Sequence, residues 1–143
     1  MSLNVIPRVQ LMSGWKALHD RHGLLPWAQL FAPAIDLARN GFPVNPDLAD
    51  ALKDRPFITE DPLFAEVYAP NGTILGLGDR CYRKKFAYTL EALANEGPDV
   101  FYGNSSIAAN IVKAVQESGG IMTEDDLAGY ETIIREPSMI EYR

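Results

Sequence analysis

Cysteine and histidine are scarce in this sequence, and long apolar runs are absent. Its 143 residues include one cysteine, Cys81, and two histidines, His19 and His22. A single cysteine excludes an internal disulfide and any zinc site built from several cysteines. No apolar stretch approaches the roughly 20 residues that a membrane-spanning helix needs. The first residues also lack the basic and apolar regions of a signal peptide.

Basic side chains are outnumbered, because 13 lysines and arginines face 19 aspartates and glutamates, which gives a net charge of −6. Phosphate binding depends largely on clustered lysine and arginine, so this balance argues against a nucleic-acid partner. The one basic run, formed by Arg80 and residues 83–85, is short. We interpret it as a solvated surface at the start of a helix.

The composition that remains is typical of a folded domain. Hydrophobic residues make up 47% of the chain, and there are six phenylalanines, six tyrosines and two tryptophans. Such a chain is too aromatic to be disordered. Its length fits one domain with a substantial core.

Apolar residues recur at helical spacing between glycine and proline punctuation. Leu11, Trp15 and Leu18 share one stripe, which Gly23 ends. Pro33 lies inside the second segment and predicts a kink or a break there. We expect a mainly α fold of about seven short helices. They are expected at residues 8–22, 26–40, 46–53, 62–68, 82–96, 106–118 and 123–130.

The end of the chain changes pattern. Residues 132–142 are rich in β-branched side chains, and Pro137 interrupts them, which predicts an edge strand or two short pieces. A lone terminal strand has no evident partner here, so we expect the chain to belong to something larger. We therefore divide it into a vector-derived start at residues 1–4, a helical domain at 5–131 and an extended segment at 132–143.

Few residues form a recognisable catalytic or metal-binding motif. His19 and His22 are spaced i, i+3, and no third metal ligand stands out, so packed or surface histidines are the favoured interpretation over a metal site. Ser105 lacks the motif that surrounds a nucleophilic serine, so we interpret the serine pair at 105–106 as a helix cap. Cys81 is interpreted as structural, although a histidine brought near it by the fold would make it a nucleophile.

The remaining motifs are also weak. The two glycines at 76 and 78 are too short a pattern for a dinucleotide site, and the sequence predicts no cofactor. Asp125 and Asp126 are expected to stabilise a helix start. Asn71 and Asn104 begin formal glycosylation sequons, which matter only if the parent protein enters a secretory pathway. Residue chemistry alone predicts a soluble, mainly helical domain without a self-contained active site.

Several segments taken together resemble one family in their order and spacing. The segments are residues 21–44, the pair Gly78-Asp79, the helix with Thr89-Leu90, residues 97–103, residues 107–130 and residues 136–143. This pattern resembles the mid-part of the heavy subunit of the γ-glutamyltransferases (γ-glutamyltranspeptidases). The resemblance covers nearly the whole chain from about Val5.

The resemblance implies a piece of an N-terminal-nucleophile hydrolase with an αββα core that cleaves itself into two chains. In that family the freed terminal threonine of the light chain attacks the γ-glutamyl amide of glutathione, and its own amine serves as the base. That threonine, and the arginine that holds the donor carboxylate, fall outside this segment. No catalytic residue is carried over, because no threonine here matches the nucleophile motif: Thr59, Thr73, Thr89, Thr123 and Thr132.

By this resemblance the segment is a scaffold that is inactive alone. Its partners would be the rest of the heavy chain and the light chain, and the location would be extracellular, periplasmic or membrane-anchored on the lumenal side. An acylase-type relative is one alternative. Another is a free-standing helical interaction module that uses Trp15, Trp27 and Phe31 as a partner surface. Cut from its parent, the chain is expected to expose apolar surface where the core would sit, and either to self-associate or to be marginally stable.

Overall fold

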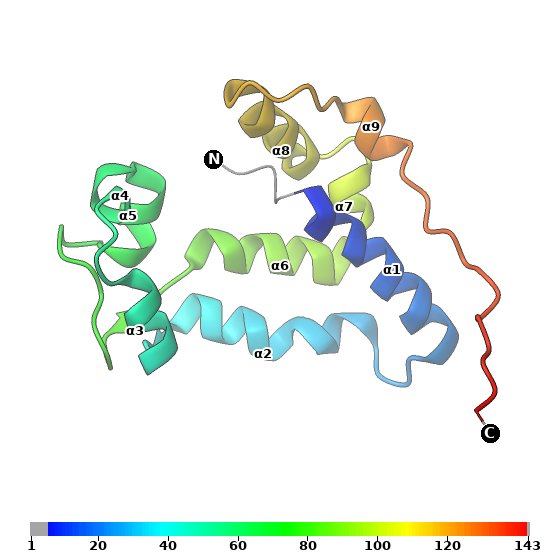
Figure 1. Cartoon of the computed structure of the whole chain (residues 1–143), viewed down its shortest axis with the longest axis horizontal. Helices are drawn as coiled ribbons and strands as arrows, with labels where there is room; N and C mark the ends of the chain where they lie inside the picture. The colour runs from blue at the N-terminus through cyan, green and yellow to red at the C-terminus, as the bar shows by residue number, and fades with distance from the viewer. Residues whose placement is uncertain (1–5, 143) are drawn as a thin grey trace. The chain divides into compact units, whose positions relative to one another are not determined.

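The computed structural model describes residues 6–142, with side chains from residue 11 onward. The chain forms two compact units (Figure 1). Unit 1 comprises the chain up to Pro26 and from Glu96 onward, and unit 2 comprises residues 27–95. No helix in the described part of the chain is both long and apolar enough to cross a membrane.

Unit 2 holds a small two-stranded sheet among helices. Its helices are α2 (Trp27–Asn40), α3 (Pro46–Leu52), α4 (Phe57–Glu60), α5 (Pro62–Tyr68) and α6 (Lys84–Glu96, the last residue assigned to unit 1). Its strands are β1 (Phe42–Pro43) and β2 (Arg80–Cys81).

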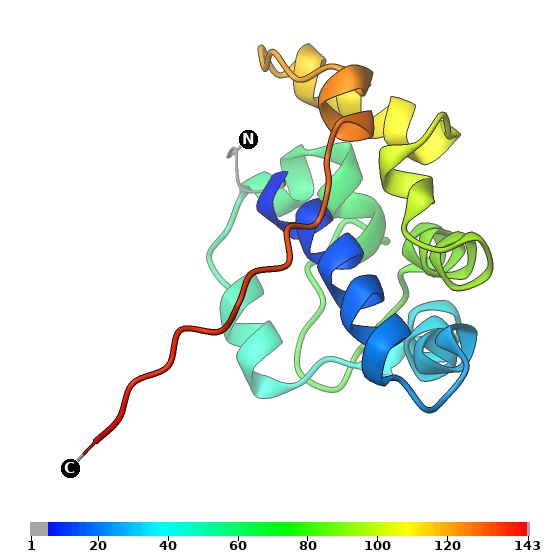
Figure 2. The same ribbon diagram turned by 90° about the vertical axis from the view of Figure 1, so that its right-hand side faces the viewer.

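Helices α2 and α6 lie side by side in both ribbon views (Figures 1 and 2). The indole Nε1 of Trp27 donates to the carbonyl of Leu93 at 2.9 Å, which ties the start of α2 to the end of α6. An ion pair between Arg39 and Glu91 joins the same two helices further along. Polar contacts from both ends of α2 therefore hold it against α6.

The core of unit 2 lies beneath α3, α4 and α5. Leu52, Ile58 and Ala69 are buried there. Partly buried side chains pack around them: Leu48, Phe64, Tyr68, Ile74 and Leu75. This cluster gives the short helices α4 and α5 a shared apolar face, which they need because helices of one or two turns are not stable by themselves.

The two strands connect distant parts of unit 2. Phe42 pairs with Cys81 and Pro43 with Arg80, in antiparallel register. Hydrogen bonds beyond the strands continue the contact, since Val44 accepts from Gly78 at 2.9 Å and donates to the Asp79 carbonyl at 2.8 Å. We call this contact the strand clip; it consists of the two strands, Val44 and residues 78–79.

Unit 1 contains α1 (Ile6–His22), α7 (Asp99–Tyr102), α8 (Ser106–Glu117) and α9 (Glu124–Ala128). Its buried cluster is small and consists of Ala108, Val112 and Leu127, with Met122 packed against it. Polar contacts add to it. The Ser13 amide donates to the Tyr102 hydroxyl at 3.3 Å, and the Ser13 and Thr132 hydroxyls lie 2.6 Å apart.

Most of the expected helices are present. The predicted proline-initiated helices are confirmed, because Asn45 caps α3 and Asp61 caps α5, each followed by proline at the first helical position. Helix α7 lies between the expected helices at 82–96 and 106–118. The sequence patterns did not indicate the single turn of α4 or the two short strands, since neither has enough residues to show a period.

One expectation is wrong in part and another is wrong. Of the kink or break predicted at Pro33, the break does not occur, because α2 continues from Trp27 to Asn40. The contacts of Trp27 and Arg39 hold the turns on both sides of the proline, which offsets the one hydrogen bond that it removes. Residues 131–142 contain no strand. Without a neighbouring strand the backbone of this segment has no ladder to join.

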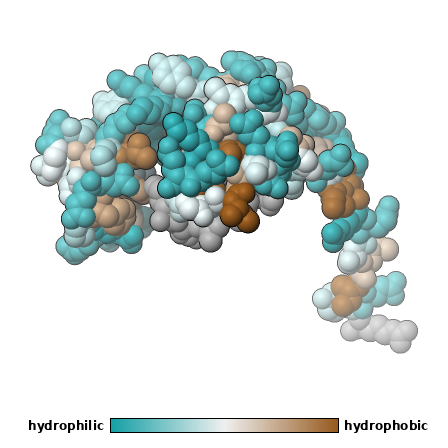
Figure 3. All heavy atoms as spheres, turned by 90° about the horizontal axis from the view of Figure 1, so that it is seen from above, coloured by the Kyte–Doolittle hydropathy of each residue, from teal (hydrophilic) through white to brown (hydrophobic). Residues whose placement is uncertain are grey.

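The apolar stripes are only partly covered. Leu11, Trp15 and Leu18 of α1 remain about half exposed, and so does Leu30 of α2. In the C-terminal segment Met139 is 93% exposed and Tyr142 is 87% exposed. Apolar side chains stand out along this segment in Figure 3. These exposed apolar side chains are available for packing against another surface.

Candidate functional site

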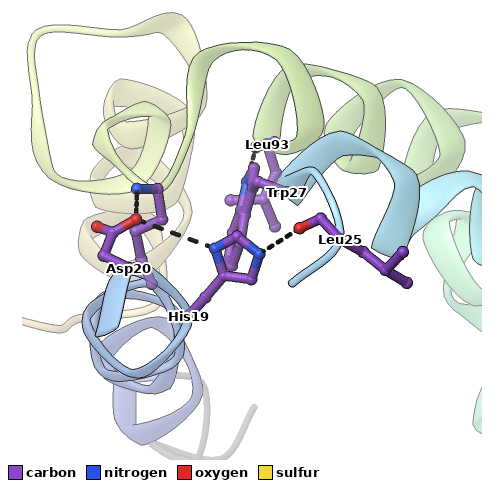
Figure 4. Close-up of polar contacts among 6 residues, drawn as sticks. His19, Asp20, Leu25, Trp27 and Leu93 are labelled. Atoms are coloured by element: carbon purple, nitrogen blue, oxygen red, sulfur yellow. Dashed lines mark hydrogen bonds and ion pairs between the residues drawn. The ribbon is translucent and has the colours of Figure 1, made fainter. Parts of the chain in front are cut away.

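The two histidines occupy different environments. The Nε2–H of His19 donates to the carbonyl of Leu25 at 2.8 Å, and its Nδ1 lies 3.9 Å from an Asp20 carboxylate oxygen (Figure 4). His22 is exposed at the last position of α1. In the part of the chain that the structure describes, no group of three or more histidine, cysteine, aspartate or glutamate side chains forms a metal-binding cluster.

Gly23 is required for the contact of His19. A Cβ atom added to Gly23 would lie 2.4 Å from the Cδ2 atom of the imidazole, far inside van der Waals contact. The Gly23 amide also donates to the carbonyl of His19. The histidine–glycine pair thus shapes the turn that ends α1, which is a structural role.

Cys81 is fully buried in β2, with its thiol Sγ 4.0 Å from the carbonyl of Val67. Burial raises the pKa of the thiol, and the nearby Arg83 cation only partly opposes this. A thiol with a raised pKa stays protonated at neutral pH and is a poor nucleophile. The structural interpretation of Cys81 fits this environment.

The serines and aspartates singled out by the sequence cap helices. Ser105 Oγ accepts from the Ala108 amide at 3.0 Å and donates to the carbonyl of Val100. Thr123 and Asp126 form a reciprocal capping box at the start of α9. The Thr123 amide and hydroxyl both donate to the Asp126 carboxylate, which lowers its pKa.

The glycine pair and the sequons lie in turns. Gly76 donates its amide to the Asp79 carboxylate at 2.8 Å, and Gly78 donates to Val44 in the strand clip. These bonds make the segment a structural turn. Asn71 and Asn104 are both exposed.

A pocket of about 430 Å³ in unit 2 was not anticipated from the sequence. Residues of α5 and of the segment that starts α6 line it: Leu63, Glu66, Val67, Tyr82, Arg83, Lys84, Lys85 and Phe86. We call it the basic pocket. The sequence signal that could have indicated it is the run 82–86, in which two aromatic residues bracket three cations.

Two cations of the basic pocket lie over aromatic rings. The Arg83 guanidinium lies 4.3 Å from the centroid of the Phe86 ring, and the Lys84 ammonium lies 5.9 Å from that of Tyr82. Lys85 pairs with the Glu66 carboxylate. Phe86 is 41% exposed and forms part of the pocket wall.

Comparison with known proteins places this chain beside one group of enzymes. The family model described as Gamma-glutamyltranspeptidase matches residues 11–143. A glutathione hydrolase of Aspergillus flavus is 38% identical over 136 residues, which cover 91% of this chain and 23% of that protein. The chain spans less than a quarter of the length of the first curated relatives that it matches.

Solved structures agree. The gamma-glutamyltranspeptidase of Pseudomonas nitroreducens, solved with L-DON, matches with a TM-score of 0.72 and 32% identity over 92% of this chain and 38% of its own. The cephalosporin acylase of Bacillus halodurans matches with a TM-score of 0.76 and 30% identity over 92% of this chain and 26% of its own.

Proposed function

We propose, because this chain belongs to the gamma-glutamyltranspeptidase family, that it is a segment of a longer enzyme that moves γ-glutamyl groups. The parent enzyme would transfer the γ-glutamyl group of glutathione to an amino acid, a peptide or water. The observation that carries this proposal is the family match over residues 11–143. The name of the Aspergillus flavus relative, a glutathione hydrolase, supports it.

The segment itself acts as scaffold in this proposal. The residues on which the family resemblance rests have structural roles in this fold. Gly78 and Asp79 form half of the strand clip, Trp27 ties α2 to α6, and Asp126 closes a capping box. The nucleophilic threonine and the arginine that binds the donor carboxylate would lie elsewhere in the parent, so the isolated chain would have no transferase activity.

The exposed apolar surface fits the same proposal. In the parent, an αββα core would pack against the helices described here, and residues 132–142 would join its central sheet. The rest of the heavy chain and the light chain would then cover α2 and the terminal segment. Leu30 of α2 is 47% exposed and Ile133 is 73% exposed, which leaves them free for such contacts.

The proposal is tested on the parent protein. A denaturing gel shows whether it splits into two chains, and a γ-glutamyl anilide assay with and without a dipeptide acceptor measures transfer. Two chains with acceptor-stimulated turnover are expected. One uncleaved chain without turnover would overturn the proposal. Product release by the purified 143-residue chain would instead contradict the scaffold role alone.

A related acylase is the second candidate, and the match to the Bacillus halodurans cephalosporin acylase favours it. The two differ in the donor that they accept. The parent protein should be offered glutaryl and γ-glutamyl donors of equal concentration. Preference for the γ-glutamyl donor supports the transferase, and preference for the glutaryl donor supports the acylase.

A further inference from the structure

The basic pocket lies between α5 and the segment that starts α6. Helix α5 lines it with side chains other than those that pack on the core of unit 2. On α5, Phe64 and Tyr68 pack on the core of unit 2, and their rings are stacked with centroids 6.5 Å apart. Leu63 and Val67 lie one position earlier in each turn and therefore line the pocket instead. The scaffold thus holds these two apolar side chains in place at a site that the core does not use.

The position of Tyr82 at the pocket is fixed by a glycine. Gly41 has a φ of +82°, and a Cβ atom there would lie 2.7 Å from a carbon of the Tyr82 ring. The absence of a side chain at Gly41 lets the ring pack directly against the backbone. Tyr82 nevertheless remains 45% exposed, because its other side faces the pocket.

The charges of the pocket are not balanced within unit 2. Glu66 pairs with Lys85, but Arg83 and Lys84 have no ion pair with any of the residues that the structure describes. Helix α6 has no acidic residue in its first turn, so the helix dipole adds to the positive potential there. This local excess of positive charge, in a chain of net charge −6, is complementary to an acidic ligand.

The side chains are also of the kind that bind polypeptides. Arginine and aromatic residues are enriched at protein interfaces, where an aromatic or aliphatic anchor fills a pocket inside a polar rim. Here Leu63, Val67 and Phe86 provide the apolar wall, and the cations provide the rim. The guanidinium of Arg83 lies over the Phe86 ring, and a guanidinium in such a position has further N–H donors for a carboxylate.

We propose that the basic pocket is a docking site for an acidic segment of a separate partner protein, in which an apolar side chain is flanked by carboxylates. The apolar side chain inserts between Leu63, Val67 and Phe86. The flanking carboxylates pair with Arg83 and Lys84. This proposal does not rest on the catalytic activity proposed for the parent enzyme.

The test is a titration of the isotope-labelled 143-residue chain, followed by amide chemical shifts. The probe is a blocked pentapeptide with leucine at its centre and aspartate or glutamate at the other four positions. We expect saturable shifts concentrated at residues 63–67 and 82–86. The same peptide with lysine in place of its acidic residues should not bind, and a central alanine should weaken binding several-fold.

Charge reversal separates a specific site from general attraction. Exposed ion pairs are each worth roughly 2- to 5-fold in affinity, so R83E/K84E, which also adds repulsion, should weaken binding about tenfold or more. Lys113→Glu makes the same kind of change on an exposed lysine of α8 and should have no effect. Leu63→Ser should weaken binding and leave the fold intact, because Leu63 is 66% exposed.

The wild-type chain provides a readout that needs no variant. Raising the salt concentration from 50 to 500 mM should weaken binding of the acidic peptide, because exposed charges are screened. The proposal is overturned if the acidic peptide causes no saturable shifts, or if the lysine peptide binds equally well. It is also overturned if shifts at the pocket follow the concentration of the protein itself, since a second copy would then be the occupant.

Discussion

The two units of this chain are held together in different ways. Unit 2 has a continuous apolar cluster around Leu52 and Ile58, enclosed by aromatic side chains from α5. Unit 1 has a smaller buried cluster of Ala108, Val112 and Leu127, with helix caps and hydroxyl hydrogen bonds around it. Apolar burial is worth more per side chain than a cap, so equivalent changes should have larger effects in unit 2.

The two units also differ in their charged residues. Residues 27–95 contain seven basic and nine acidic side chains, whereas the rest of the chain contains six basic and ten acidic ones. Three of the acidic residues of unit 1, Glu124, Asp125 and Asp126, occupy the first turn of α9. The start of α9 therefore follows the helix-dipole rule, whereas the start of α6 in unit 2 breaks it with two lysines. Such departures from a local rule are expected at functional sites.

The largest expected effect is a core truncation in unit 2. Ile58→Ala should lower the free energy of unfolding by about 3 kcal/mol, because Ile58 is 2% exposed and its removal leaves a cavity. Val112→Ala is the matched change in unit 1 and should cost about 2 kcal/mol, since it removes less buried surface. Urea unfolding, monitored by hydrogen exchange at individual amides, measures both losses of stability. Equal effects would contradict the difference between the cores.

Two glycine-to-alanine substitutions come second, and they test the contact of Tyr82 beside the strand clip. Gly41→Ala should cost about 2 kcal/mol or more, because alanine must adopt a left-handed backbone and its methyl group would meet Tyr82. Gly72→Ala places alanine at the nearly equal φ of +79° with open space around it, and should cost only about 1 kcal/mol. The difference between the two urea midpoints isolates the tyrosine contact. A larger loss for Gly72→Ala would refute this account.

A helix cap in unit 1 comes third. Ser105→Ala should cost about 1 kcal/mol, because it removes the hydroxyl that accepts from Ala108 and donates to Val100. Ser106→Ala changes an exposed residue one position further along and serves as the control. Thermal unfolding should show a clear drop for the first variant and almost none for the second. The same loss in both would mean that the cap contributes nothing specific.

The smallest effect is a pH dependence in α9. The Thr123 amide and hydroxyl lower the pKa of the Asp126 carboxyl in the folded chain. A carboxyl with a lower pKa in the folded than in the unfolded state stabilises the fold above its unfolded pKa, and this contribution is lost as the pH falls through the folded pKa. Asp126→Asn should therefore be less stable than wild type at pH 7, and the difference should shrink as the pH falls below the unfolded pKa of about 4.

The control for that pH dependence is Asp125→Asn, in the same helical turn but outside the capping box. Urea midpoints at a series of pH values are the measurement. Asp125→Asn should remain close to wild type throughout. A gap between Asp126→Asn and wild type that persisted unchanged at low pH would show that its origin is not the carboxylate.

Helix positions were predictable because helix caps and helix stops are specified by residues that are neighbours in the sequence. Asn45 and Asp61 before proline, Ser105 before α8 and Thr123 before α9 each specify a helix start over a few residues. The strand clip was not predictable, because it pairs Phe42 with Cys81 through residues that show no strand pattern. Long-range pairing of two-residue strands leaves no periodic signal.

The candidate site residues also divide into those whose roles were predictable from local sequence and those whose roles were not. The structural roles of Ser105 and Asp126 followed from local rules, whereas the basic pocket depends on how α5 meets the start of α6. Arg83 and Lys84 were interpreted as solvated, and nothing near them in sequence shows that Leu63 and Val67 stand opposite. A charge run acquires a functional meaning only when the fold places apolar surface beside it.

The strand clip also has a consequence for the order of folding. Arg80 donates to the carbonyls of Asn40 and Gly41, so the clip joins residues 39 to 40 positions apart in the chain. Closing such a loop costs more entropy than forming the local contacts between α4 and α5 that it encloses. Those local contacts shorten the effective loop, so the helices should form first and the clip last. Hydrogen exchange during refolding should accordingly protect α5 before it protects β2.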